Sequence, residues 1–195
     1  MNKNIIILAA GICLFFGFSF ISVESKPIEI TQYSSYVKFQ DENLFSYADI
    51  VAAGKVVSVN QPKEMSIDIG GEQKPMIYKD YIFEINKSIK GDYPSGSKFI
   101  IRIPGGEIGK TKFVSDDVAP EPGQEQILFL KNWKYGASTD ETYIILGGQQ
   151  GKFLIDVDKV VNSEKTMTVA TFDAQMQGFK NKYGNKVVLP PGFLR

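Results

Sequence analysis

The sequence contains no histidine, and its single cysteine, Cys13, lies in an apolar N-terminal segment. Without an imidazole, the chain cannot assemble a Ser-His-Asp or Cys-His catalytic arrangement, and it lacks a common zinc ligand. The rest of the chain also has no disulfide and no thiol nucleophile. These absences exclude most enzyme chemistries, so we expect a protein that is not an enzyme and that carries no cofactor.

Net charge is absent as well. Lys and Arg number 22, Asp and Glu number 22, and the formal net charge is zero. Arginine is rare, since Arg102 is the only one before the C-terminal Arg195. Because nucleic-acid binding depends on clustered Lys and Arg, the composition predicts no nucleic-acid partner.

The first 25 residues have a pattern of their own. Lys3 precedes an uncharged apolar run of 19 residues, from Ile5 to Val23. A positive residue followed by such a run is typical of a segment that directs export. Because Lys3 is expected to stay inside, the following domain would lie outside. The sequence therefore predicts a secreted or extracytoplasmic protein.

Three outcomes are open for this export segment. Val23 and Ser25 fit the small residues needed for cleavage before Lys26. The run also has the length of a transmembrane helix, so it can remain as an uncleaved membrane anchor. Lipidation at Cys13 is the third outcome, and the bulky Ile12 before it argues against it. We expect contact with a membrane only if the segment stays uncleaved.

The remaining chain is long enough for one domain with its own core. We expect a signal peptide or membrane anchor over 1–25 and an N-terminal arm over 26–43. A β-barrel domain is expected over 44–170, and a C-terminal helix and tail over 171–195. A cysteine-free exported domain of this size favours a prokaryotic cell envelope, because small eukaryotic secreted modules are usually rich in disulfides.

Short strands separated by Gly- and Pro-containing turns dominate the middle of the chain. Gly54 interrupts an otherwise β-rich run in the way that a β-bulge does. The apolar run Ile127–Leu130 predicts a strand that is buried on both faces. The expected strands are Ile50–Val59, Ile77–Ile89, Lys98–Ile103, Ile127–Leu130, Tyr143–Leu146 and Lys152–Asp156, with a polar hairpin loop over Gln61–Lys74 and a last hairpin of Val160–Val161 with Met167–Ala170.

Helices are expected on either side of these strands. A short one covers Asp41–Tyr47 with Asp41 as its cap, and a longer one is capped by Thr171 and ends at Gly184. The longer helix carries one apolar stripe, which indicates core packing. The fold class predicted is mainly β: an OB-fold-like five-stranded barrel with a short N-terminal helix and an amphipathic C-terminal helix. The stripe consists of Phe172, Met176, Phe179 and Tyr183.

The segment 104–125 is expected to be a long loop, beginning with a turn at Gly105 and Gly106. Loops of this length in a compact domain are usually functional or mobile. Its acids are consistent with a solvated surface, with a carboxylate pair of a hydrolase, or, together with Asp156 and Asp158, with a calcium site. We assign no metal site, and calcium stays open. The acids are Glu107, Asp116, Asp117, Glu121 and Glu125.

Five segments together form a pattern that is similar to one group of proteins, and the similarity is mostly structural. They are Ala48–Val57, Ile89–Asp92, Ile101–Gly106, Gly123–Leu130 and Gly151–Phe153. Together they resemble exported prokaryotic proteins that are similar to the N-terminal domain of tissue inhibitors of metalloproteinases, the netrin-like OB-fold group. The resemblance covers about Leu44 to Asp156 and implies a five-stranded barrel with flanking helices.

The resemblance does not carry the inhibitory function. Inhibitors of that family chelate the protease's zinc through a mature N-terminal Cys. Here the predicted mature chain starts at Lys26-Pro27 and contains no Cys. No inhibitory residue can be transferred, and a fold alone does not define a function.

The sequence as a whole predicts an exported, non-enzymatic binding protein whose partner is a protein or a glycan of the cell envelope. An OB-fold face and the 104–125 loop would form the binding surface. Two alternatives stay open: a membrane-anchored structural or accessory protein of the envelope, and a hydrolase that uses the loop acids. The candidate ligand-binding residues are Arg102 as a charged contact and Gly105, Gly106 and Glu107 as the positioning turn.

Overall fold

Strands make up 53% of the computed structural model, which describes residues 27–33, 38–69, 71–133 and 141–188. The expected signal peptide or anchor over 1–25 lies outside these residues, so export stays a prediction. Within the described ranges, no helix is both long and apolar enough to cross a membrane.

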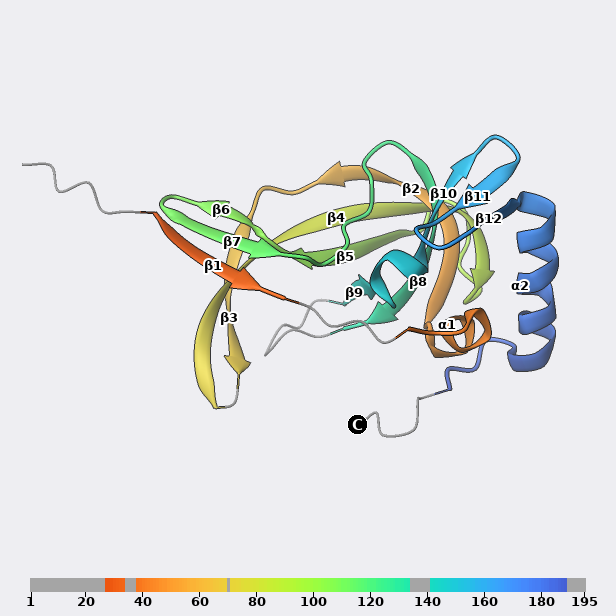
Figure 1. Cartoon of the computed structure of the whole chain (residues 1–195), viewed down its shortest axis with the longest axis horizontal. Coiled ribbons are helices and arrows are strands. Elements are labelled where there is room, and N and C mark those ends of the chain that lie inside the picture. Colours follow the sequence, from red (N-terminus) through yellow and green to blue (C-terminus); the bar gives the residue numbers. More distant parts are fainter. Residues whose placement is uncertain (1–26, 34–37, 70, 134–140, 189–195) are drawn as a thin grey trace, which may run out of the picture.

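Five strands form a closed ring, which confirms the predicted barrel. The ring runs from β2 (Ile50–Val59) to β4 (Glu72–Lys90), β5 (Lys98–Pro104), β9 (Thr142–Ile145) and β8 (Glu125–Asn132), and then back to β2. All pairings in the ring are antiparallel except the parallel pair of β5 with β9. Figure 1 shows this barrel to one side of the molecule, next to both helices. The architecture is consistent with an OB-fold-like barrel.

Strand β2 bends sharply at Gly54, as its sequence predicts. The pairing of β2 with β4 shifts register between Ala53 and Gly54. A Cβ atom at Gly54 would lie 2.1 Å from the carbonyl oxygen of Glu84, a distance that no side chain tolerates. Glycine is therefore required because the two backbones approach each other closely at this bend.

Strand β8 and the first half of β2, Ile50–Gly54, are buried on both faces, which confirms the expectation for Ile127–Leu130. Alternate residues of these strands point to two different hydrophobic clusters. Val51 and Phe129 join a cluster that the helices cover, whereas Ala52 and Leu128 join the cluster formed with β4, β5 and β9. We call the second cluster the barrel core.

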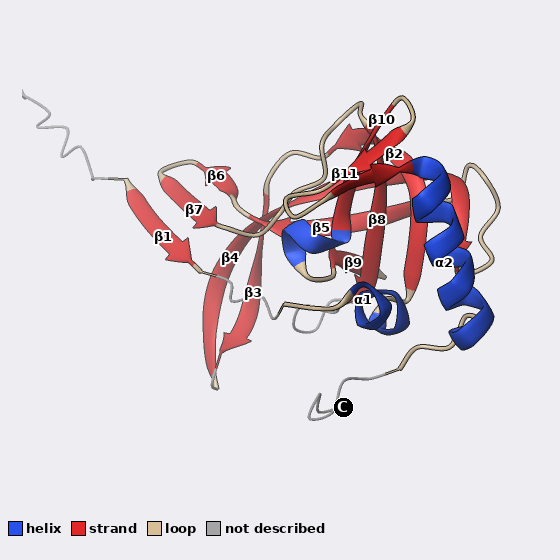
Figure 2. Ribbon diagram, turned by 45° about the vertical axis from the view of Figure 1, so that its right-hand side comes forward, coloured by secondary structure: helices blue, strands red, loops and turns tan. Residues whose placement is uncertain are grey.

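The two helices cover the outer face of β2 and β8 (Figure 2). They are α1 (Asp41–Tyr47) and α2 (Val169–Tyr183). The predicted stripe of α2 is confirmed, because Phe172 and Met176 are buried in the first cluster and Phe179 and Tyr183 pack against it. Both predicted N-cap residues, Asp41 and Thr171, were wrong, because the caps lie at other positions.

The helix boundaries explain those two errors. Helix α2 begins three residues earlier than expected, and its N-cap is Thr168, whose hydroxyl accepts a hydrogen bond from the Thr171 amide at 3.1 Å. The N-cap position of α1 is Gln40, so Asp41 lies in the first turn instead. A carboxylate in the first turn still favours the helix through the helix dipole.

A second group of strands extends away from the barrel, and the sequence did not predict it. The segment 104–125 contains a hairpin of β6 (Gly106–Ile108) and β7 (Thr111–Ser115), and β1 (Ile28–Gln32) joins β7 in parallel. The expected polar loop 61–74 is largely strand, formed by β3 (Lys63–Ile69) and the start of β4. We call β1, β3, β6, β7 and residues 72–79 of β4 the lobe (Figures 1 and 2).

The lobe has a small hydrophobic cluster of its own. Its buried members are Met76, Ile77, Tyr78 and Phe113. At the other end, β10 (Lys152–Asp156), β11 (Lys159–Val161) and β12 (Thr166–Thr168) extend the sheet from β8, which confirms the last predicted hairpin. A 3-10 turn, Gly148–Gly151, leads into β10.

Candidate ligand-binding site

Arg102, expected as a charged contact, does not reach the surface. Its side chain is 2% exposed and forms a two-pronged ion pair with Asp80, the residue opposite it on β4. The Arg102 Nε–Asp80 Oδ1 distance is 2.8 Å, and the Nη2–Oδ2 distance is 3.0 Å. The guanidinium also lies 4.1 Å from the centre of the Tyr78 ring. This corrects the prediction, because Arg102 stabilises the junction of barrel and lobe and is not accessible to a ligand.

Gly105 and Gly106, expected to form a positioning turn, line a surface cleft. Both have φ near +130°, a conformation that favours glycine. The turn is held in place by the Gly105 amide, which donates a hydrogen bond of 2.7 Å to the Ile77 carbonyl. A Cβ atom at Gly106 would lie 3.0 Å from the side chain of Pro62. The backbone conformation therefore favours glycine at both positions, and the close approach of Pro62 favours it further at Gly106.

The cleft has a volume of about 290 Å³ and collects residues from the barrel and the lobe. Strand β4 contributes Lys79 and Tyr81, β7 contributes Ser115, and the segment after β7 contributes Asp117 and Ala119. Tyr81 and Ala119 also pack against the barrel core, so the cleft lies beside the barrel interior. Barrel mouths and junctions are common places for ligand sites. We call it the Gly-turn cleft.

The chemistry of the Gly-turn cleft is mixed. It offers an ammonium from Lys79, a phenol from Tyr81, a carboxylate from Asp117 and an apolar wall that includes Ile103. Burial raises the pKa of the Tyr81 phenol above its ordinary value, so this group stays a neutral hydrogen-bonding group at physiological pH. Such a surface can bind a partner by one aromatic contact together with several hydrogen bonds.

The acids of the 104–125 segment are dispersed. Glu107 is exposed on β6, outside the lining of the cleft, while Asp117 lies in the cleft. Glu121 forms an ion pair with Lys152, and Glu125 accepts a hydrogen bond from Asn86. Among the described residues, no group of three or more acids is placed to hold a metal ion. The structure thus keeps Gly105 and Gly106 in the candidate site and leaves Glu107 beside it.

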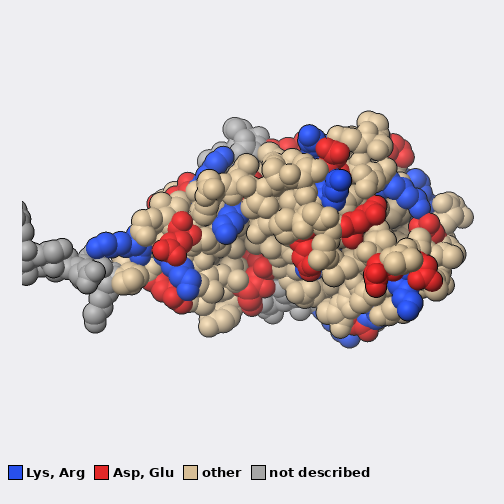
Figure 3. Space-filling view, turned by 90° about the horizontal axis from the view of Figure 1, so that it is seen from above, with Lys and Arg blue, Asp and Glu red and all other residues tan. Residues whose placement is uncertain are grey.

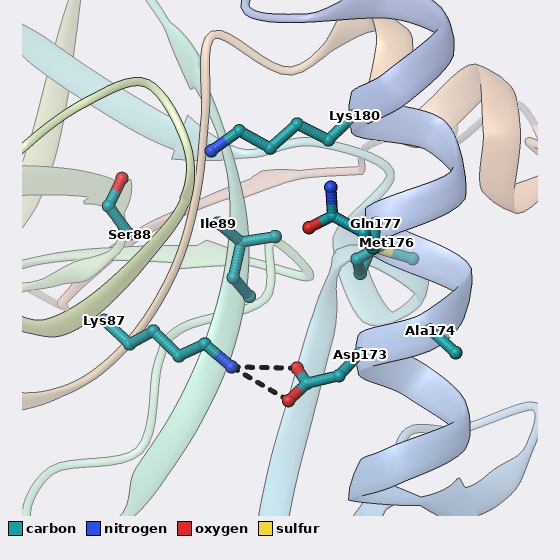
Figure 4. A pocket seen from close by; sticks show the side chains of 8 residues that line it. All are labelled: Lys87, Ser88, Ile89, Asp173, Ala174, Met176, Gln177 and Lys180. Carbon is teal, nitrogen blue, oxygen red and sulfur yellow. Dashed lines mark hydrogen bonds and ion pairs between the residues drawn. The ribbon is translucent and has the colours of Figure 1, made fainter.

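A second cleft, of about 360 Å³, lies between α2 and β4. Figure 4 shows Lys87 of β4 and Asp173 of α2 facing each other across it, with Nζ–Oδ distances of 2.9 and 3.0 Å. Lys180 extends from the next turns of the helix, and its Nζ lies 4.0 Å from an Asp92 carboxylate oxygen. Because the cationic groups here are paired within the chain, we regard this cleft as a seam between helix and barrel.

Lys90 is the most unusual titratable residue of the barrel. Its side chain is fully buried, and its ammonium donates hydrogen bonds of 2.8, 3.1 and 2.7 Å to the carbonyls of Phe45, Ser46 and Ala48. Burial lowers the pKa of Lys90 to about 8. The amine caps the C-terminal end of α1, where the helix dipole favours a cation. Its role is structural, and it lines neither of the two clefts described above.

Charges of both signs are mixed on one face of the molecule. On the face seen in Figure 3, Lys, Asp and Glu side chains alternate, and no extended area of one sign is visible. This agrees with the zero net charge of the sequence. Long-range electrostatic attraction of a polyanion needs a concentrated positive surface.

Sequence reasoning missed Lys79, Tyr81, Ser115 and Asp117 as members of one site. Two signals pointed to part of it: Tyr81 lies on the predicted strand Ile77–Ile89, and Asp117 lies in the long segment 104–125. The pairing of β4 with β5 is what brings Tyr81 opposite Ile101, near the turn at Gly105 and Gly106. No local pattern predicts that β7 would fold back over the same strands.

The fold and the cleft together define an OB-fold-like barrel with an added strand lobe and a binding-sized cleft between them. No protein-family model, curated protein or solved structure matches the chain. The netrin-like resemblance therefore stays a prediction beyond the OB-like barrel itself.

Proposed function

We propose that this protein is an exported, non-enzymatic binding protein that takes a protein or an envelope glycan at the Gly-turn cleft. The observation that supports this most is the position of the cleft beside the barrel interior, with Gly105 and Gly106 on its wall. OB-fold proteins commonly recognise ligands through their second and third strands and the adjoining loops. Here those strands are β4 and β5, which contribute Tyr81 and Ile103.

The groups in the cleft favour binding over catalysis. The Ser115 hydroxyl oxygen accepts a hydrogen bond of 3.1 Å from the Asp117 amide, a local turn interaction. The sequence holds no imidazole that could activate this hydroxyl as a nucleophile. Tyr81 and Lys79 instead offer stacking and hydrogen bonding, which suit a sugar ring or a side chain of a partner protein.

Variants of the Gly-turn cleft and of the second cleft, between α2 and β4, test this proposal. Three full-length proteins are compared: the parent, the double variant Tyr81→Ser with Lys79→Gln in the Gly-turn cleft, and Lys87→Gln in the second cleft. Each would be cross-linked in the envelope and medium of the source organism. In parallel, each would be applied to isolated envelope glycan. We expect one defined partner to be retained by the parent and by Lys87→Gln and to be lost from the cleft variant. Equal retention by all three proteins would refute the Gly-turn cleft as the binding site.

A membrane-anchored accessory protein is the second candidate. It is favoured by the 19-residue length of the apolar run Ile5–Val23, which reaches the span of a bilayer. Only four residues separate that run from the start of β1, so an anchor would hold the lobe close to the membrane. Recovery of a shortened, freely soluble chain from the medium would eliminate this candidate.

A further inference from the structure

Strand β1 is attached to the molecule through a single neighbour. It pairs in parallel with β7, with Ile28 opposite Thr111 and Gln32 opposite Ser115. The Ile28 amide also donates a hydrogen bond of 2.9 Å to the Lys110 carbonyl. The outer edge of β1 has no strand partner among the described residues, since the sheet order is β1-β7-β6. Strand β1 is thus an edge strand.

The side chains of β1 hold it only lightly. Ile28 is 60% exposed, and Ile30 is the one residue of the strand that packs against the lobe cluster. Glu29 forms an ion pair with Lys112 at 3.4 Å, but both side chains are more than half exposed, and such pairs contribute little. Parallel pairing is also slightly less stable per residue than antiparallel pairing. Detachment of β1 would therefore break few contacts of the fold.

Detachment of β1 would expose a well-defined acceptor. The β7 edge would present backbone N–H and C=O groups in the register that β1 now uses. Beside it, the seat of Ile30 would open over Phe113, which is buried in the lobe cluster. Extended peptides bind exposed sheet edges by adding a strand, with backbone hydrogen bonds for affinity and side-chain seats for specificity.

We propose that the β7 edge is a strand-acceptor site for an extended segment of a partner protein, and that β1 is a built-in competitor that occupies it. The occupant is defined by β1 itself: a parallel strand with an aliphatic side chain at the Ile30 position. An acidic residue at the Glu29 position would face Lys112. The inference needs only the β7 edge and holds whether or not the Gly-turn cleft binds a ligand.

Two variants and one peptide test this site. Ile30→Asp removes the only packed side chain of β1 and releases the edge. Glu29→Cys with Lys112→Cys, in a Cys13→Ser background, locks β1 to β7, because directly paired positions on neighbouring strands have the spacing of a disulfide. The probe is a fluorescent peptide with the sequence of residues 26–33, and its anisotropy is measured with full-length chains in mild detergent.

We expect Ile30→Asp to bind the peptide at least tenfold more tightly than the parent, because the competitor is gone. The oxidised locked chain should show no binding, and reduction should restore the parent value. A peptide carrying Asp at the Ile30 position is the matched control and should bind none of the chains. Equal binding to the parent, the released and the locked chains would overturn the proposal.

Two further outcomes are decided by separate measurements. If Ile30→Asp is poorly folded, hydrogen exchange of the parent provides the test: the peptide at high concentration should protect the β7 amides, and the lock should abolish its effect. Absence of that protection would overturn the proposal. If the parent instead forms a concentration-dependent dimer that the lock abolishes while the peptide fails to bind, the acceptor takes a second copy, and the partner-protein assignment is wrong.

Discussion

The barrel and the lobe are built from the same kind of strands but hold together differently. Each barrel strand has a barrel neighbour on both sides, because the pairing of β8 with β9 closes the ring. The lobe keeps open edges at β1, β3 and β6, each with one partner among the described strands. The lobe cluster has four buried residues, of which only Met76 and Ile77 are fully buried, whereas two larger clusters fill and cover the barrel. We therefore expect stability to be concentrated in the barrel and the lobe to open more easily.

Hydrogen exchange can measure this difference in stability between the barrel and the lobe. Regions with few buried contacts and exposed backbone hydrogen bonds open at lower free energy than a closed core. The two candidate binding surfaces, the Gly-turn cleft and the β7 edge, both involve β7, which belongs to the less stable region. Substitutions in the barrel, in the lobe and at their junction test this difference in stability, and the largest effect is expected at the junction.

The junction of the two regions should be the most sensitive point. Arg102→Ala would leave the Asp80 carboxylate buried without its partner, and we expect the free energy of unfolding to fall by about 4 kcal/mol. The double variant Asp80→Leu with Arg102→Met removes both charges and should recover most of the loss. Urea denaturation of the three proteins measures it. A single variant as stable as the parent would contradict the buried pair.

Within the barrel, the bend at Gly54 is the next test. Gly54→Ala forces a methyl group against the backbone of Glu84, and we expect a loss of about 3 kcal/mol. The matched control is Gly178→Ala in α2, where a Cβ atom meets open space and a gain of about 0.5–1 kcal/mol is expected. Thermal unfolding of both variants distinguishes close backbone approach from general glycine effects.

The buried amine of Lys90 gives the barrel a pH dependence. Lys90→Met removes the donor of three carbonyls and should cost about 2 kcal/mol at pH 7. In the parent the folded pKa is lowered to about 8, against 10.5 for the exposed amine, so the unfolded state binds more protons between these values. The parent's stability should therefore rise with pH in this window, by about 2 kcal/mol between pH 8 and 9.5.

The Met variant should lack that rise, and the difference between the two stability curves isolates Lys90. Measurements above pH 10 are avoided because burial raises the pKa of Tyr143, and this group destabilises the fold once tyrosines ionise in the unfolded chain. Identical pH curves for parent and variant would show that Lys90 keeps an ordinary pKa.

The lobe should give the smallest effect. Ile30→Ala trims a half-buried side chain of an edge strand, and we expect a loss of about 1 kcal/mol. Ile101→Ala is the matched barrel variant, and because Ile101 is fully buried it should lose about 3 kcal/mol. Equal losses at the two sites would contradict the division into a stable barrel and a lightly held lobe.

Much of the barrel could be predicted because its signals are local. The alternation of β4, the apolar run of β8 and the break at Gly54 each follow from side-chain periodicity and backbone sterics. The stripe of α2 follows from helical geometry in the same way. The lobe escaped prediction because β3, β6 and β7 are short or polar, and their strand character comes from pairing with neighbours.

The candidate site shows the same limit: a local turn is visible in the sequence, whereas the pairing of two strands is not. Gly105 and Gly106 were identified because a turn that needs glycine is visible in the sequence. Arg102 was misjudged because no local signal says that Asp80 lies opposite it on the next strand. A lone charged residue in an apolar strand is compatible with either a surface contact or a buried pair. Only the register of β4 with β5 decides between them.

The parallel pairing of β5 with β9 has a consequence for how the chain folds. It joins Ile100 to Thr142 and Ile101 to Tyr143, residues about 40 positions apart in the chain. Contacts between such distant residues form slowly, because the intervening segment must lose conformational entropy before the pairing can stabilise the chain. The order of events would place the local hairpins first and closure of the ring last. Until that closure, the closing edges of β5 and β9 are exposed to other unfolded chains, which makes the last folding step the one most open to aggregation.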